Sequence, residues 1–308
     1  MTEWEANGYT VVRSLVRASL IDALVSEFRT DILPSGQAML RQPRFAQESG
    51  ERSFPHAYLA SHDLSPEGYM RQGLKDPHSL ASYPSVAGLC LRLLCGPEIQ
   101  SALAAIDPAY KAYTLYQSMM FDANPGTEPH QDSFYIDSEP RGALVGMWLA
   151  LEDIDERAGR FFVVAGSHRN VNLPLGAMTN AEYLQTVAAR MPALGNHIET
   201  PALCKGDAIL WHVRLVHGAH PVTDSRFSRK SLTAHYVPCD LAARGNARVF
   251  TNHIVRTAAG MPYVVTTKPD PGARRVVKAE VHTVDIEGKP TSFRSLMTAD
   301  GERVVIVE

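Results

Sequence analysis

The pair His130 and Asp132, separated by one residue, constrains this chain more than any other feature. On a β-strand, that spacing directs both side chains to one face. A distant histidine such as His217 could join them there. Two imidazoles and one carboxylate can occupy one face of a six-coordinate metal and leave the opposite face free. This ligand set is typical of non-haem Fe(II) oxygenases, and it predicts a β-rich fold around a metal.

Three downstream histidines are candidates for the third ligand: His212, His217 and His220. In the run 207–217, His217 has the same parity as Trp211 and the other apolar residues, whereas His212 has the opposite parity. Parity decides which face of a strand a side chain occupies, so it favours His217. His220 falls in a predicted loop. The alternative for the short H-x-D motif is a histidine and an aspartate that make ordinary hydrogen bonds at a strand end.

Composition limits the classes of protein to consider. The chain has 308 residues, 45% of them hydrophobic, which suits one large globular domain. A formal net charge of −3 gives no sign of a nucleic-acid partner. The four cysteines form no C-x-x-C pair, so we expect reduced thiols and no cysteine zinc site. The first residues, Met-Thr-Glu-Trp-Glu, are acidic rather than basic, and no apolar run is expected to approach the roughly 18 residues of a membrane span, so we expect a soluble, cytoplasmic protein without membrane partners.

The pattern of apolar residues predicts helices followed by strands. Helices are expected over 16–31, with Ser19 as a cap, and over 84–95, about 97–105 and 180–191. Strands are expected at Gly8–Val12, Tyr113–Phe121, Ala143–Leu151, Phe161–Val164, Ala208–Leu215, Leu232–Val237, Arg275–Ile286, Ser292–Met297 and Val304–Val307. Short strands separated by turn signals indicate a sandwich or barrel. The fold is therefore predicted to be mainly β with flanking helices.

We expect a single domain over 1–308, because no repeat or low-complexity linker interrupts the chain. Its helical part is predicted at about 1–108, its β core at about 109–240 and a strand-rich extension at about 241–308. The segments 34–80 and 170–200 have weak periodicity and are expected to shape a substrate pocket. A homo-oligomer through the C-terminal strands is left open.

Arg229 and Ser231 form a second candidate site. An arginine can bind a carboxylate through two parallel hydrogen bonds. On a strand, Arg229 and Ser231 would face the same way and could clamp one carboxylate together. The alternative is a surface arginine at the start of a strand.

Several short motifs, taken in order, resemble the phytanoyl-CoA dioxygenase family of Fe(II)/2-oxoglutarate-dependent oxygenases. They are His130-Gln131-Asp132, Trp148, Gly166-Ser167-His168, Gly206-Asp207, His217-Gly218, Arg229 and His235-Tyr236. The resemblance extends from about Tyr113 to Tyr236. It implies a double-stranded β-helix, which is a jelly-roll barrel of the cupin type, with flanking helices.

The resemblance also implies roles for single residues. His130, Asp132 and His217 would hold Fe(II), and O₂ would bind there. Arg229, assisted by Ser231, would pair with the distal carboxylate of 2-oxoglutarate. Three further residues match positions near this cosubstrate: Gln131, Trp148 and Met119. Trp148 and Met119 lie in apolar strands, so a purely structural place in the core is their alternative.

The implied reaction is hydroxylation of an unactivated C–H bond of a small molecule, with CO₂ and succinate as co-products. The chain departs from the family where Asp122-Ala123-Asn124 replaces a basic residue before the H-x-D motif, and where Ala219 follows Gly218. Two alternatives remain: a cupin-type metalloenzyme that does not use 2-oxoglutarate, and a jelly-roll sugar-binding module. Candidates for contact with a polar or anionic substrate are Arg44, His56, Arg141 and Arg226.

Overall fold

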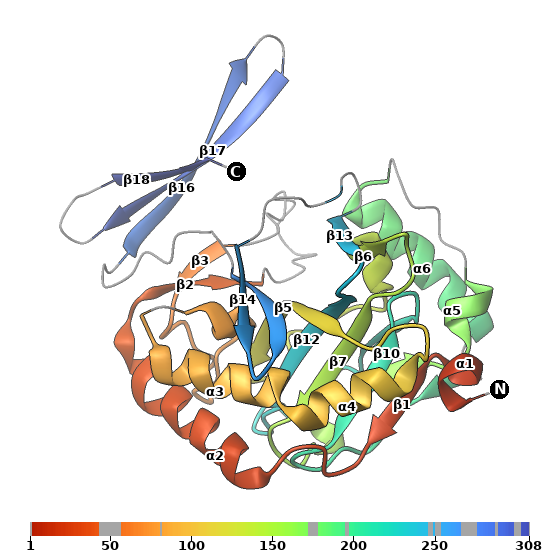
Figure 1. Ribbon diagram of the computed structural model, residues 1–308. Helices are drawn as coiled ribbons and strands as arrows, with labels where there is room; N and C mark the ends of the chain where they lie inside the picture. Colours follow the sequence, from red (N-terminus) through yellow and green to blue (C-terminus); the bar gives the residue numbers. More distant parts are fainter. Residues whose placement is uncertain are drawn as a thin grey trace.

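A large sheet, antiparallel in all but one pairing, forms the centre of the computed structural model (Figure 1). The structure describes residues 2–42, 57–80, 82–171, 178–194, 197–245, 249, 254–265, 276–286, 289–298 and 303–307. In spatial order the sheet contains β1 (Tyr9–Val12), β10 (Ala208–His212), β7 (Val145–Ala150), β12 (Ser231–Pro238), β5 (Tyr113–Phe121), β4 (Leu74–Lys75), β2 (Ala38–Arg41) and β3 (Ala57–Ala60). β15 (Met261–Val265) joins it beside β5, and β14 (Ile254–Ala258) pairs with β15.

A smaller sheet faces the large one. It contains β11 (His217–Ala219), β8 (Phe161–Val164) and β9 (Ile198–Glu199), and nearby β6 (Ile136–Glu139) pairs with β13 (Ala242–Gly245). Trp148 and Trp211 of the large sheet share one apolar cluster with Phe161 and Val163 of the small sheet. The two sheets therefore enclose a core between them, as the predicted jelly-roll requires.

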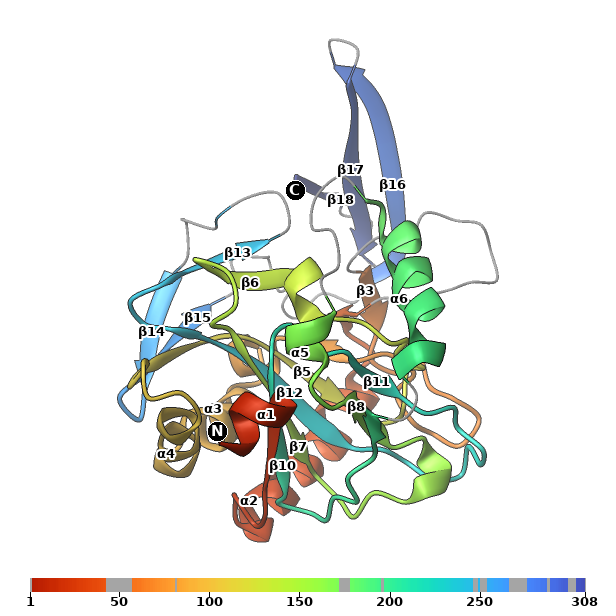
Figure 2. The same ribbon diagram turned by 90° about the vertical axis from the view of Figure 1, so that its right-hand side faces the viewer.

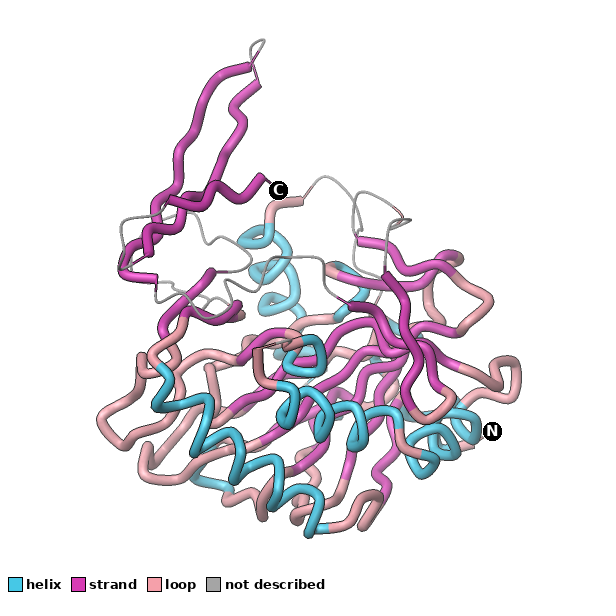
Figure 3. Tube along the Cα trace, turned by 60° about the vertical axis from the view of Figure 1, so that its left-hand side comes forward, coloured by secondary structure: helices cyan, strands magenta, loops and turns pink. Residues whose placement is uncertain are grey.

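Helices cover the opposite face of the large sheet. In Figures 1 and 3, α2 (Ala18–Glu27), α3 (Pro84–Cys95) and α4 (Pro97–Ile106) lie across that face. Alternation along the strands makes this possible: Leu149, Leu210 and Leu232 point to the helices, and their neighbours point to the small sheet. The shorter α1 (Glu3–Asn7), α5 (Ser167–Asn170) and the longer α6 (Asn180–Leu194) lie elsewhere on the molecule.

Most predicted elements are confirmed, with two local errors. The helix expected over 16–31 is α2, which continues into a π-helical turn at Phe28–Ile32. Its N-cap is Arg17 rather than Ser19, and no side chain caps it. The strand expected at Ala208–Leu215 ends already at His212, because the chain turns before β11 begins.

The expectation that no apolar run is long enough to span a membrane is wrong for one stretch, judged by its length and composition. Pro84–Ile106 is a stretch of 23 residues with a mean hydropathy of 1.3, long and apolar enough to cross a membrane. In the structure it consists of two helices, α3 and α4, that meet at Gly96. Leu94 and Leu103 are fully buried in the cluster shared with the large sheet. Part of the stretch therefore packs in the core, where 44% of its apolar window is buried.

The end of the chain contains a separate antiparallel sheet of β16 (Val276–Ile286), β17 (Lys289–Thr298) and β18 (Arg303–Val307). Figure 2 shows β16 and β17 projecting from the rest of the fold. The strands predicted in this tail are thus confirmed, whereas a turn at Asp300-Gly301 lies outside the described residues. β13 and β15 pair with β6 and β5, so the first part of the predicted extension is tied to the core. The single domain over 1–308 stays a prediction.

The turn before β10 ties the N-terminal segment to the large sheet. Gly206 has a φ of +91°, a conformation that glycine adopts easily. The Asp207 carboxylate accepts hydrogen bonds from the Ser14 amide at 2.8 Å, the Cys204 amide at 3.0 Å and the Arg13 guanidinium at 2.7 Å. Gly206-Asp207, one of the family motifs, is therefore a turn that also anchors the segment after β1.

We predict that Asp207→Ala lowers the free energy of unfolding at pH 7 by about 1–3 kcal/mol, because it removes the charged acceptor of three hydrogen bonds. Burial alone would raise the pKa of Asp207, but hydrogen bonds from Cys204 and Ser14 and the charge of Arg13 lower it. Its contribution is thus present above the unfolded pKa and is lost as the pH falls through the folded pKa. Urea unfolding at pH 7 and pH 3 should show a smaller difference between variant and wild type at pH 3.

The matched control is Asp22→Ala, which removes an exposed ion pair with Lys205 and should change stability by less than about 1 kcal/mol. Equal stability of Asp207→Ala and wild type at pH 7 would contradict the anchoring role.

Candidate metal centre

Two backbone hydrogen bonds bring the predicted ligands together. The His130 amide donates to the His217 carbonyl, and the His217 amide donates to the His130 carbonyl, both at 2.9 Å. His217 is the first residue of β11, whereas His130 forms only this isolated bridge. Asp132 opens a 3₁₀ turn, Asp132–Phe134, instead of continuing a strand. The H-x-D pair therefore converges on one site, although not through regular strand geometry.

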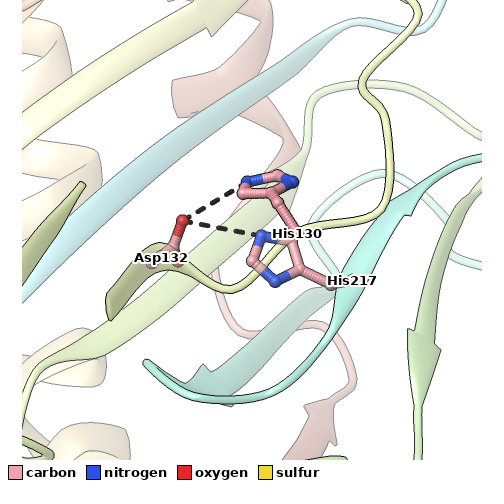
Figure 4. Close-up of side chains that lie close together, drawn as sticks. All are labelled: His130, Asp132 and His217. Atoms are coloured by element: carbon pink, nitrogen blue, oxygen red, sulfur yellow. Dashed lines mark ion pairs between the residues drawn. The ribbon is translucent and has the colours of Figure 1, made fainter. Parts of the chain in front are cut away.

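The three side chains point toward one another (Figure 4). Asp132 Oδ1 lies 3.5 Å from His130 Nε2 and 3.7 Å from His217 Nε2. One ligand atom from each residue lies within 4.8 Å of the others. Among the described residues, these three are the group of histidine, cysteine and acidic side chains that could hold a metal ion. Two imidazole nitrogens and one carboxylate oxygen are donors that suit Fe(II).

Each imidazole is held with the same nitrogen toward the site. His130 Nδ1 lies 2.8 Å from the Glu128 carbonyl, and His217 Nδ1 lies 2.9 Å from the Leu215 carbonyl. A carbonyl only accepts, so Nδ1 carries the proton and donates. The lone pair of Nε2 then faces Asp132 in both rings. Such outer contacts are typical of metal-ligating histidines.

The charges of the site agree with metal binding. Burial lowers the pKa of His217 to about 4, so its imidazole is neutral near pH 7 and can donate a lone pair. Burial would raise the pKa of Asp132, but its neighbours His217, His235 and His130 lower it well below the usual value, so Asp132 is an ionised carboxylate near pH 7. The site thus offers the neutral imidazole of His217 and the carboxylate of Asp132, with His130 Nε2 directed toward the same point.

The second oxygen of Asp132 is held by two residues that the sequence analysis did not place in the site. Trp211 Nε1 donates to Asp132 Oδ2 at 2.8 Å, and His235 Nε2 lies 3.2 Å from the same oxygen. Trp211 can approach because Gly146 opposite it has no Cβ; one would lie 2.2 Å from the indole ring. Oδ2 is therefore occupied, and Oδ1 is left for a metal.

A cavity extends from the ligands to Arg229. Its lining includes the three ligands and Met119, Trp148, Arg229 and Thr233. Arg229 is 3% exposed, and its Nη1 donates to the Gly159 carbonyl at 3.2 Å. Among the described residues no carboxylate pairs with it, and its Nε has no hydrogen-bond partner. Burial lowers the pKa of Arg229 to about 9, which is the signature of a cation without a counter-ion.

Two hydroxyl groups next to Arg229 also lack partners. Ser231 Oγ and Thr233 Oγ1 are buried without a hydrogen bond in the described structure. Both residues lie on β12, on the same side of the strand. Buried polar atoms are nearly always hydrogen-bonded in native proteins, so an unpaired hydroxyl fits a bound ligand. Thr233 lines the cavity, whereas Ser231 is outside its lining. Thr233 was missed from the sequence, although its parity with Ser231 could have indicated it.

Met119, Trp148 and Gln131 were also predicted near the cosubstrate, and only the first two line the cavity. Met119 and Trp148 line the cavity, and the guanidinium of Arg229 lies 5.9 Å from the Trp148 ring centre. Trp148 also belongs to the core between the sheets, so its structural role is confirmed, and its contact with the cosubstrate stays a prediction. Gln131 is outside the cavity lining, and its side-chain amide donates to the carbonyls of Val171, at 3.0 Å, and Arg214. Its contacts favour a structural role over the predicted place beside the cosubstrate.

The four candidates for substrate contact are not brought together. Arg141 donates to the Ser133 carbonyl at 2.9 Å, and Arg226 is an exposed residue that pairs with Asp224. Neither lines the cavity. Arg44 and His56 lie outside the described residues.

The two facing sheets and the His-Asp-His ligand set define a jelly-roll metalloprotein. The family profile of phytanoyl-CoA dioxygenase (PhyH) matches residues 4–231. The chain therefore belongs to the phytanoyl-CoA dioxygenase family. This is the family that the motifs predict, and the His-Asp-His group of the described residues fits the iron that its predicted class, the Fe(II)- and 2-oxoglutarate-dependent dioxygenases, requires.

Individual relatives are distant. Phytanoyl-CoA dioxygenase domain-containing protein 1 of Bos taurus is 30% identical over 166 residues, which is 45% of this chain and 56% of that protein. The chain thus spans about half the length of this relative. The peroxisomal phytanoyl-CoA dioxygenase of Bos taurus is 22% identical over 298 residues, 90% of this chain and 81% of that protein.

Solved structures support the fold. The epimerase SnoN, crystallised with Fe3+, alpha ketoglutarate and nogalamycin RO, has a TM-score of 0.55 at 19% identity, over 80% of this chain and 85% of that one. EctD from S. alaskensis, with 2-oxoglutarate and 5-hydroxyectoine, has a TM-score of 0.52 at 18% identity, over 79% of this chain and 76% of that one. These similarities confirm the double-stranded β-helix.

We predict that His130→Ala, Asp132→Ala and His217→Ala each lose most of their bound Fe(II), because each removes one of three ligands. His212→Ala and His220→Ala are matched controls, and both should load as wild type does. Fe(II) content after anaerobic loading and desalting measures the effect. Full loading of His217→Ala would show that the metal lies elsewhere.

Proposed function

We propose that the protein hydroxylates an unactivated C–H bond of a small molecule and converts 2-oxoglutarate and O₂ to succinate and CO₂. The observation that carries this proposal is Arg229, a buried arginine without an acidic partner in the cavity of the His-Asp-His triad. Iron with 2-oxoglutarate supplies the oxidant when both are bound. The relatives' names concern their own substrates, and the substrate of this chain is proposed only as a small molecule.

The residues of the chain divide the work between two ends of the cavity. His130, Asp132 and His217 would hold the metal at one end. Arg229 would receive a carboxylate at the other, where a charge-assisted pair is strong because water is excluded. Ser231 and Thr233 offer hydroxyl groups next to that arginine. The arrangement would fix both ends of a dicarboxylate and so orient it relative to the metal.

Arg229 also separates this proposal from its rivals. A cupin-type enzyme that does not use 2-oxoglutarate, or a sugar-binding module, has no need for a buried and unpaired arginine behind a metal triad. Burying an unpaired charge costs free energy, so such a residue requires a ligand that compensates it. Residence in the cytoplasm and self-association through β16–β18 remain predictions.

We predict that Arg229→Leu raises the Michaelis constant for 2-oxoglutarate and leaves Fe(II) content unchanged. Loss of one partner from a buried charge pair costs roughly 2–5 kcal/mol. Arg226→Leu is the matched control, because Arg226 is exposed and pairs with Asp224. Succinate production at varied 2-oxoglutarate concentrations measures the effect. An unchanged Michaelis constant in Arg229→Leu would contradict the carboxylate clamp.

We also predict that the product carries one oxygen atom from O₂ and no chlorine. Asp132 fills the third ligand position, so no position is vacated for chloride. A metabolite library should first be screened for compounds that increase succinate yield. Mass spectrometry of the product formed under ¹⁸O₂ with chloride present then tests the prediction. A chlorinated product, or a product of unchanged mass with stoichiometric succinate, would overturn hydroxylation.

A further inference from the structure

A line of polar side chains continues from Asp132 across three neighbouring strands. His235 lies on β12, Gln117 on β5 and Lys75 on β4. β12 pairs with β5 so that His235 is opposite Gln117, and β4 pairs with the same β5. The line therefore crosses the sheet from strand to strand, and its last step is diagonal because Lys75 lies opposite Met119.

Each neighbour in this line is joined by a hydrogen bond. His235 Nε2 lies 3.2 Å from Asp132 Oδ2, and His235 Nδ1 lies 2.9 Å from Gln117 Nε2. Gln117 Oε1 accepts from Lys75 Nζ. Lys75 is only 8% exposed, and its Nζ also lies 3.9 Å from Asp76 Oδ1.

The lysine gives this line a direction. An ammonium group can only donate, so Lys75 holds Gln117 with Oε1 toward itself. The amide nitrogen of Gln117 then faces His235 Nδ1 and donates to it. His235 Nδ1 must accept, which leaves the ring proton on Nε2. His235 therefore donates to Asp132 Oδ2.

The direction matters at the metal ligand. Asp132 Oδ2 receives two N–H groups, one from His235 and one from Trp211, while Oδ1 faces His130 and His217. With the opposite ring tautomer, the lone pair of His235 Nε2 would face the carboxylate oxygen and repel it. The tautomer thus decides whether Asp132 is held with Oδ1 toward the metal.

We propose that Lys75 is a positioning residue for the iron ligand Asp132, and that it acts through Gln117 and His235. This inference rests on the iron site of the proposed function. Lys75 and Gln117 are not among the residues that line the cavity. The hydrogen bonds described above link them to Asp132 through His235.

A double-mutant cycle on Fe(II) affinity tests the inference. Lys75→Met removes the donor, and Gln117→Leu removes the next member of the line. Changes behind a metal ligand typically cost about 10–100-fold in metal affinity, and we expect about tenfold for each variant. The double variant should lose no more than either single variant, because both break one chain. Anaerobic Fe(II) titration without 2-oxoglutarate gives the affinity independently of turnover.

Three comparisons separate positioning from a general structural effect. Lys75→Arg keeps a group that only donates and should retain near wild-type affinity. Lys205→Met removes the lysine of an exposed pair with Asp22 and should leave affinity unchanged. Thermal unfolding reports whether each variant folds. If Lys75→Met does not fold, Gln117→Met breaks the line one step later and should show the same loss.

The outcomes are distinct. Unchanged Fe(II) affinity in Lys75→Met and Gln117→Leu overturns the inference while the iron site stands. A higher 2-oxoglutarate requirement with unchanged iron affinity would instead mean that Lys75 contacts the cosubstrate, and it also overturns the inference. Additive losses in the double variant would show that Lys75 does not act through Gln117. Absence of Fe(II) binding by the wild type would contradict the proposed function itself.

Discussion

The reciprocal hydrogen bonds between the backbones of His130 and His217 are the contact on which the site depends. They join the loop after β5 to the first residue of β11, in the smaller sheet. Both imidazoles then reach the same point, and the 3₁₀ turn that starts at Asp132 brings the carboxylate to it. The remaining fold serves this contact: helices cover one face of the large sheet, so its other face is free to form the cavity.

Strand β12 links the two ends of that cavity. Leu232, Ala234 and Tyr236 pack on the helical side, whereas Thr233 and His235 face the site. One strand therefore carries a core face and a functional face, which its period of two makes possible. Arg229, just before β12, is buried and has no acidic partner among the described residues, and the proposed carboxylate ligand would offset this local cost to stability.

The sequence is enough to predict most strands and the three candidate ligands. It is not enough to predict how these residues are arranged in space. Tyr113–Phe121 and Phe161–Val164 are apolar runs bounded by turns, and both strands have those bounds. His217 was preferred through strand parity, yet β10 ends at His212 and His217 begins another strand. His217 still lies beside His130 and Asp132, as the family motif implies, although the strand parity that favoured it does not apply. Contacts across strands, such as Trp211 with Asp132, depend on register and could not be read from spacing.

A crystal structure of the protein loaded anaerobically with Fe(II) and 2-oxoglutarate tests the central claim most directly. Anomalous scattering at the iron edge locates the metal without reference to any relative. The account predicts iron bound by His130 Nε2, Asp132 Oδ1 and His217 Nε2, with a carboxylate of 2-oxoglutarate on the guanidinium of Arg229. Iron at another site, or 2-oxoglutarate bound without contact to Arg229, would contradict it.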